Sequence, residues 1–295
     1  MPLTTLAALV FEYGLVALGW LLIWRLQFSS TARKSRATMP DPLPHWPVDS
    51  ASFAFAGLCV MLGWLASSIA LGQVLRLFPA IKADDILLTI LNGTFSQLGL
   101  FSGMLAGAYY IRQTAQRQPL NDPPVTAKAT PAVITGKANL VLAALATFAI
   151  TIAVVYPVQW LWEQLLLALH LPTTKQEVVE IFFRSSSPGR VAALAAMAVL
   201  LAPVTEELVF RAGLFRFLRG RTPRWIALVL PALIFASLHV DYKTLDGLIS
   251  LAPLTAFGFI FALAYERTGR IAVVMLAHAL FNLHTVVFLL LGLGN

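Results

Sequence analysis

Long apolar runs alternate with short polar segments along most of this chain. Five of the runs contain no Asp, Glu, Lys or Arg: Ala51–Leu75, Ile86–Ile111, Ala138–Trp162, Gly247–Tyr265 and Ile271–Leu291. Each is close to or above the roughly 20 residues that a helix needs to cross a bilayer. Since lipid offers no hydrogen-bond partner to the backbone, such runs are expected to be helical.

Three further runs are apolar but carry polar residues. Leu3–Trp24 contains Glu12, Val191–Phe217 contains two acids and an arginine, and Trp225–Val240 is short and ends near His239. The first run has no basic n-region and no clear small-residue cleavage site, so we expect a retained helix and not a signal peptide. The complete pattern predicts an all-α fold, a polytopic transmembrane helical bundle of about eight helices.

The polar segments divide the chain without adding a separate soluble domain. Residues 25–50 and 112–137 are rich in Pro, Ser, Thr and charge, which is typical of exposed loops. We therefore predict N-terminal transmembrane helices of unassigned role over residues 1–137 and a C-terminal bundle over residues 138–295. Residues 174–184 alternate charged and apolar side chains, so a short interfacial helix and a plain loop both stay open.

Composition and charge place the chain in a membrane. Of its 295 residues 58% are hydrophobic and only 12% are charged, which is outside the range of soluble domains. The net charge of +7 sits mostly in loops, so we expect membrane lipid, and no nucleic acid, as a partner. The single cysteine, Cys59, excludes an internal disulfide.

The distribution of basic residues predicts the orientation. Loops after the first, third, fifth and seventh predicted helices hold 14 of the 21 Lys and Arg, and the loops on the other side hold six. Because basic loops stay in the cytoplasm, both termini are expected to be extracytoplasmic. We expect an integral protein of the bacterial inner membrane.

Glu206, Glu207 and Arg211 lie at membrane depth in the stretch "LLAPVTEELVFRAGLF". An ionisable residue there costs roughly 2.5–3.5 kcal/mol on insertion scales, so it normally faces a partner or a wet cavity. Glu207 and Arg211 are spaced i and i+4, which favours an ion pair, and Glu206 points about 100° away around the helix. The pattern therefore predicts one neutralised acid and one free acid, although a structural salt bridge between helices is an alternative.

Two more helices carry polar pairs at the same spacing. "FASLH" puts Phe235 and His239 on one helical face, and "HALFN" does so for His278 and Asn282. Counting about 1.5 Å per residue from the basic flanks places Glu206 and His278 at similar depths, roughly 15 and 12 Å, whereas His239 falls at roughly 22 Å. His239 agrees only if its helix tilts or begins in the interface.

The ordered motifs "EELVFR", "FASLH" and "HALFN", together with "YERTGR" before the last one, resemble the CPBP or Abi family of intramembrane proteases. That family includes the CAAX prenyl endopeptidases and bacteriocin-processing or immunity proteins, and the resemblance covers residues 191–291. It implies a catalytic set of Glu206, Glu207, Arg211, His239, His278 and Asn282.

The resemblance also implies roles for these residues. Glu206 with His239 would activate water, and His278 with Asn282 would face the oxyanion. Glu207, paired with Arg211, would orient the helix and tune its neighbour. The substrate would be a peptide or protein in the membrane, with or without a lipid modification.

Two questions stay open at this point. Glu206, His239 and His278 would also suit a catalytic zinc ion, but no His-Glu-x-x-His spacing favours a metal, so a metal-free reaction is the preferred hypothesis. An inactive membrane adaptor or immunity-type protein that retains the motifs is the alternative to a protease. A proton-coupled transporter is less favoured, because we find no internal repeat.

Overall fold

The computed structural model describes residues 3–30, 32, 34, 43, 46–117, 137–174, 187–242, 244–245 and 247–292. The described chain is helical and has no strand in these ranges, so the predicted all-α bundle is confirmed. In order, the elements are α1 (Leu3–Ile23), η1 (Trp24–Phe28), α3 (Ser50–Leu77), η2 (Pro79–Ala83), α4 (Asp85–Arg117), α5 (Lys137–Ala168), α7 (Pro188–Ala196), η3 (Met197–Leu201), α8 (Ala202–Glu207), η4 (Leu208–Phe215), α9 (Arg216–Arg219), α10 (Arg224–Ser237), η5 (Leu248–Ser250), α11 (Leu251–Thr268) and α12 (Ile271–Leu290).

Seven helices in the described part of the chain are long and apolar enough to cross a membrane. The segments α7 to α9 form one of them, Pro188–Arg219. The chain is therefore an integral membrane protein. The eighth predicted helix is α10, whose 14 residues rise about 21 Å, less than the roughly 30 Å of a hydrocarbon core.

Some predicted boundaries were wrong. The loop expected from residue 112 begins later, because α4 continues as a helix to Arg117 through Gln, Thr, Ala and Arg. Most of these residues are good helix formers and they carry α4 out of the apolar region. Residues 175–186, predicted as an interfacial helix or a loop, lie outside the described residues.

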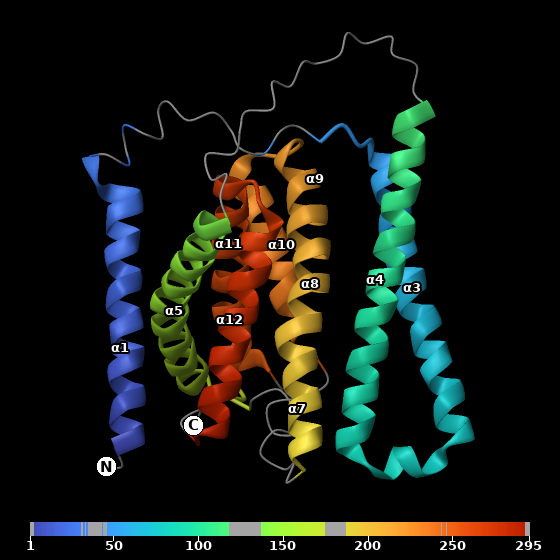
Figure 1. Cartoon of the computed structure of the whole chain (residues 1–295), viewed down its shortest axis with the longest axis horizontal. Coiled ribbons are helices and arrows are strands. Elements are labelled where there is room, and N and C mark those ends of the chain that lie inside the picture. The colour runs from blue at the N-terminus through green and yellow to red at the C-terminus, as the bar shows by residue number, and fades with distance from the viewer. Residues whose placement is uncertain are drawn as a thin grey trace.

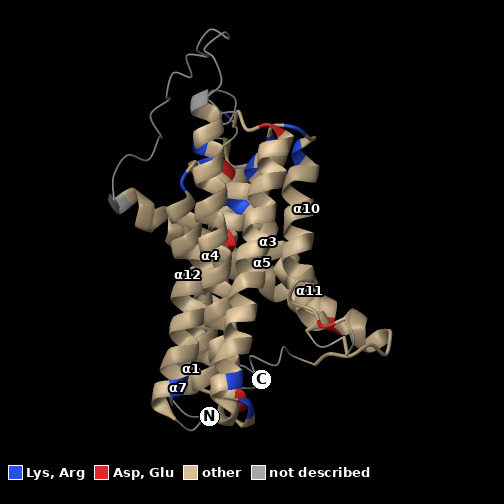
Figure 2. Ribbon diagram, turned by 90° about the vertical axis from the view of Figure 1, so that its right-hand side faces the viewer, with Lys and Arg blue, Asp and Glu red and all other residues tan. Residues whose placement is uncertain are grey.

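The helices form a central group with two flanking units. Figure 1 shows α5, α10, α11 and α12 beside the long helix that contains α8, with α1 on one side and the α3–α4 hairpin on the other. The start of α1 and the end of α12 lie at the same end of the bundle (Figure 1). Figure 2 shows most charged residues at the two ends of the helices and few between them, as a bilayer requires.

The core of the central group is aromatic and aliphatic. Phe215, Phe235, Phe257 and Phe261 are almost fully buried, and they pack with Val273 and Val274 of α12. Helices α10 and α11 approach closely at Gly258, where an added Cβ would lie 2.9 Å from Cα of Ala232. This close approach brings the aromatic side chains of α10 and α11 together.

Ion pairs connect neighbouring helices at both ends of the bundle. Glu266 of α11 is nearly buried and pairs with Arg219 of α9 at 2.5 Å and with Arg224 of α10 at 2.6 Å. At the opposite end, Asp84 pairs with Arg190 of α7 at 2.5 Å. These contacts tie α9, α10 and α11 together and attach the start of α4 to α7.

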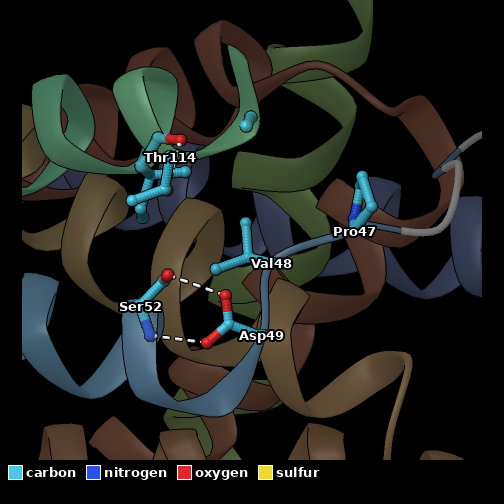
Figure 3. A pocket seen from close by; sticks show the side chains of 7 residues that line it. Pro47, Val48, Asp49, Ser52 and Thr114 are labelled. Atoms are coloured by element: carbon cyan, nitrogen blue, oxygen red, sulfur yellow. Dashed lines mark hydrogen bonds between the residues drawn. The ribbon is translucent and has the colours of Figure 1, made fainter. Parts of the chain in front are cut away.

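The segment before α3 is fixed by a helix cap. Asp49 accepts hydrogen bonds from the Ser52 backbone N–H at 2.9 Å and from the Ser52 hydroxyl at 2.7 Å (Figure 3). These bonds hold the pKa of the Asp49 carboxyl below its ordinary value. A small pocket lies here between the start of α3 and the end of α4, and none of the predicted site residues lines it.

Helices α3 and α4 pack through glycine. A Cβ added at Gly63 would lie 2.3 Å from the carbonyl oxygen of Gly99 and 2.9 Å from Cα of Gly103, which are backbone atoms of α4. Gly57, on the same helix, has nothing within 4 Å of such a Cβ. The two glycines therefore differ in what faces them.

We expect Gly63→Ile to destabilise the protein by about 1–3 kcal/mol, because the side chain must push α4 away. Gly57→Ile is the matched control, since it makes the same change in helix propensity without a clash. Thermal unfolding in detergent measures both. Equal melting temperatures for the two variants would show that α3 and α4 do not pack this closely.

Candidate functional site

The helix that carries the two central acids is not a regular α-helix. Its six-residue segment α8 (Ala202–Glu207) lies between two π-helical stretches, η3 and η4. A π turn adds one residue to a helical turn and is frequent at functional sites. The sequence predicted a single helix here, and its only hint of irregularity was Pro203, whose missing N–H breaks the helical ladder.

Glu207 and Arg211 form the predicted ion pair. Arg211 Nη1 lies 3.0 Å from Glu207 Oε1, and both side chains are almost fully buried, at 2% and 0% exposure. His278 of α12 also contacts this carboxylate, with its Nδ1 2.8 Å from the same Oε1. Glu207 therefore joins a cation on its own helix to an imidazole on another.

Glu206 lies on the other side of the same imidazole. Its Oε2 is 3.8 Å from His278 Nε2, and its side chain retains 18% exposure. The His278 ring is thus placed between the two adjacent acids, with one nitrogen facing each. The two carboxylates differ as expected, because Glu207 is buried and paired to arginine while Glu206 remains accessible.

Aromatic rings surround the arginine. The guanidinium carbon of Arg211 lies 4.9 Å from the ring centre of Phe235, 5.5 Å from Phe261 and 5.7 Å from Phe257. The Phe257 ring also meets the His278 ring at 4.8 Å in an edge-on arrangement. These cation–π contacts compensate part of the cost of burying a cation.

Two atoms of the pair have no hydrogen-bond partner among the described residues. They are Oε2 of Glu207 and Nη2 of Arg211, and both are inaccessible. Unpaired buried polar atoms are few in folded proteins, and a catalytic role is one explanation for them. The ion pair by itself therefore leaves one buried oxygen and one buried nitrogen without a hydrogen bond.

His239 lies where the helix has already ended. The prediction placed it inside a helix that ran to Val240, but α10 ends at Ser237 and His239 belongs to the following turn. Its Nδ1 contacts the backbone oxygen of Phe235 at 2.8 Å. The Phe235 ring lies 4.8 Å from the His239 ring and 6.5 Å from the His278 ring, so one aromatic side chain contacts both imidazoles.

Asn282 contacts backbone near the start of the π-helical stretch. Its Nδ2 donates a hydrogen bond to the backbone oxygen of Ala198 at 2.7 Å. In the register of η3, where the N–H of Ala202 donates to Met197 five residues back, the Ala198 oxygen would accept from residue 203. That residue is proline and has no N–H, so Asn282 satisfies an oxygen that the helix leaves free.

The possible zinc ligands are not gathered into one cluster. Among the residues that the structure describes, no group of three or more His, Cys, Asp or Glu is placed to hold a metal ion. Glu206 Oε2 and His278 Nε2 lie 3.8 Å apart, whereas the contacts of His239 are with Phe235. Glu206, His239 and His278 therefore do not fit a three-ligand site in this arrangement.

A second polar contact at membrane depth was missed by the sequence analysis. Glu12 of α1 lies beside the Tyr156 hydroxyl of α5 and near His284 of α12. His284 is buried and stacks on Phe288 at 4.3 Å. Three separate helices contribute these groups, so spacing along the sequence could not reveal them.

Comparison with known proteins identifies the same region of the chain. Residues 188–284 match the family model described as type II CAAX prenyl endopeptidase Rce1-like. The resemblance to the CPBP family is confirmed. All six predicted site residues lie within the matched segment.

Two curated relatives share part of this region. The chain is 34% identical over 96 residues to the putative membrane peptidase YdiL of Bacillus subtilis, which is 32% of this chain and 37% of the relative. It is 36% identical over 99 residues to the membrane-embedded CAAX protease MroQ of Staphylococcus aureus, again 32% of this chain and 38% of the relative. The matches thus span less than two fifths of either relative. No solved structure matches the chain significantly.

The two adjacent acids should respond differently to mutation. Glu207→Ala strands a buried arginine, and breaking such a pair costs roughly 3–5 kcal/mol. Glu206→Gln removes a partly exposed carboxylate without a cationic partner on its helix, so the protein should keep its stability. Melting temperatures in detergent distinguish the two variants, and equal values would contradict this division.

Proposed function

We propose that the chain is an intramembrane endopeptidase that hydrolyses a peptide bond of a membrane-associated protein or peptide. The single observation that carries this proposal is the His278 ring between two unlike carboxylates, one buried and paired and one accessible. The family match and the names of the two relatives support a membrane protease. The proposed substrate is a membrane-associated peptide or protein, with or without a lipid modification.

The proposed reaction begins with water activated by Glu206. The Glu206 carboxylate takes a proton from water while the water oxygen attacks the peptide carbonyl carbon. His239, in the turn after α10, is proposed as its partner on the family resemblance alone. General-base catalysis of this kind needs an accessible carboxylate near the reacting atoms, which its 18% exposure allows. The acquired proton then passes to the leaving nitrogen as the C–N bond breaks, so the overall reaction consumes one water.

The developing oxyanion needs hydrogen-bond donors. With Nδ1 fixed against Glu207, a protonated His278 can donate from Nε2 to the oxygen that gains charge. Asn282 uses one of its two amide hydrogens on Ala198 and keeps the other for the same purpose. Glu207 and Arg211 act as positioning residues, because they hold His278 in place and do not contact the substrate.

No metal enters this reaction. Glu206, His239 and His278 have donor atoms that zinc accepts, and in such a site zinc would supply Lewis acidity to bound water. The proposal rests instead on the acid and imidazole groups themselves, because the three side chains do not form a single cluster in the described structure.

Both termini are proposed to lie outside the cytoplasm in a bacterial inner membrane.

A second candidate function is that of an inactive membrane adaptor. The observation that favours it is the use of His239 and Asn282 as partners of backbone oxygens, since both contacts would persist without catalysis. The accessible Glu206 distinguishes the two candidates, because an adaptor has no need of a free acid beside His278. Activity measurements therefore decide between them.

We expect Glu206→Gln to reduce peptide hydrolysis by about 10²–10⁴-fold, the usual contribution of a positioned base. The assay uses purified protein in liposomes with a library of fluorogenic membrane peptides, and mass spectrometry locates the cleaved bond. Glu163→Gln, the same change on α5, is the matched control and should leave the rate unchanged. Full activity in Glu206→Gln would exclude this residue as the base.

We expect hydrolysis to survive exhaustive chelation, because the proposed base is a carboxylate and not a metal-bound hydroxide. Metal content is measured on the same sample after dialysis. If activity disappears with the chelator and returns with one equivalent of zinc, the metal-free mechanism is wrong although the protease assignment stands. In that case the Asn282 variant should also be less impaired than either histidine variant, since amides are not favoured zinc ligands.

A further inference from the structure

Helix α4 contacts the helix that carries Glu206 at three levels. At one end Asp84, just before α4, pairs with Arg190 of α7. In the middle Gly93 meets Met197, and further along Gln97 meets Thr205. Since α4 lies outside the matched segment 188–284, nothing in the family comparison accounts for these contacts.

The middle contact shows how closely the two helices approach. A Cβ added at Gly93 would lie 2.1 Å from Sδ of Met197, so the α4 backbone lies directly against that side chain. Gln97 is four residues further along, which is one helical turn or about 6 Å, on the same face of α4. The close approach at Gly93 therefore carries Gln97 to the level of α8.

At that level the Gln97 amide oxygen accepts a hydrogen bond from the Thr205 hydroxyl. Thr205 is buried, with 4% exposure, and directly precedes Glu206 in the chain. Its hydroxyl also lies 3.1 Å from the backbone oxygens of Leu201 and Ala202. Gln97 therefore gives Thr205 a hydrogen-bond partner on a different helix, α4.

The rotation of α8 about its axis decides which acid faces the substrate. Successive residues on a helix point about 100° apart, so a slip of one residue would put Glu207 or Thr205 in the direction that Glu206 now faces. The π-helical stretches on both sides of α8 each hold an extra residue, and they allow such a slip more easily than a regular helix does. A contact from another helix is needed to select one rotation.

We propose that Gln97 is a positioning residue that fixes the orientation of Glu206 by holding Thr205. The inference rests on the proposed function, in which Glu206 is the base, and it deepens that function. It also gives a role to a helix of the N-terminal part, to which the sequence analysis assigned none. Gln97 itself does not contact the substrate in this proposal.

The test is a double-mutant cycle on hydrolysis. We expect Gln97→Leu and Thr205→Val each to lower kcat roughly 10- to 100-fold with KM unchanged, because a misplaced base slows the chemical step more than it weakens binding. The double variant should be no slower than the single ones, since both remove the same bond. Thr205→Ser keeps the hydroxyl and should retain activity, but only when Gln97 is present.

Gln73→Leu on α3 is the matched control. Gln73 is exposed and its side chain contacts Arg76 of the same helix, so its loss should leave kcat unchanged. The proposal would be overturned if the loss in kcat of the Gln97 and Thr205 double variant equals the product of the two single losses. Full activity in either single variant would also overturn it. A rise in KM with unchanged kcat would also overturn it, because it would indicate a binding role.

A cross-linking experiment tests the contact without using activity. On a Cys59→Ala background the pair Gly93→Cys and Met197→Cys should form a disulfide on mild oxidation, because the two positions adjoin. Absence of the cross-link would overturn the inference by showing that α4 lies elsewhere. If the cross-link forms but the protein hydrolyses no peptide, the proposed function is wrong. The proposed role of Gln97 in catalysis is then wrong as well, although the contact between the two helices stands.

Discussion

The architecture of the central bundle depends on one buried cation. A guanidinium in hydrocarbon must be surrounded by partners, and Glu207 on the same helix covers only one side of Arg211. Phe235 of α10 and Phe257 and Phe261 of α11 cover other sides. Gly258 permits this, because a larger residue there would separate α10 from α11.

The charge of this cluster explains why a histidine completes it. Two ionised acids and one arginine leave one net negative charge at membrane depth, which is costly without a further cation or proton. His278 lies between both acids, so a proton on its ring makes the group of four neutral. The proposed mechanism places a proton on the same ring at the oxyanion, so charge balance and the proposed chemistry would call for the same group.

What the sequence could predict follows from how local each contact is. The Glu207–Arg211 pair spans one turn of one helix, and helix geometry alone places its members together. The contact between His278 and Glu207 joins residues 71 positions apart, and the one between Gln97 and Thr205 joins residues 108 apart. Such contacts depend on which helices are neighbours, and hydrophobic periodicity says nothing about neighbours when every run is apolar.

The fold was predictable to a similar degree and for similar reasons. Spans appear because a bilayer demands long uncharged runs, and seven of the expected eight are full-length helices. The end of α10 was not predictable, because Leu238 and Val240 beyond it are still apolar. The division into residues 1–137 and 138–295 stays a prediction, although α1 packs on α5 at Gly19, where a Cβ would meet the Ala149 oxygen at 2.2 Å.

Asn282 illustrates why a motif residue can serve two purposes. Pro203 lies three residues before Glu206 and removes the N–H that would satisfy the Ala198 oxygen. A carbonyl left without a partner between packed helices is costly, and a donor from a neighbouring helix removes that cost. Asn282 supplies this donor from the same face of α12 as His278. By doing so it fixes the distance between α12 and the helix with the acids, which is the distance that sets Glu206 against His278. An amide that completes the backbone on one side and offers its second hydrogen on the other therefore links the packing of the helices directly to the geometry of the proposed reaction.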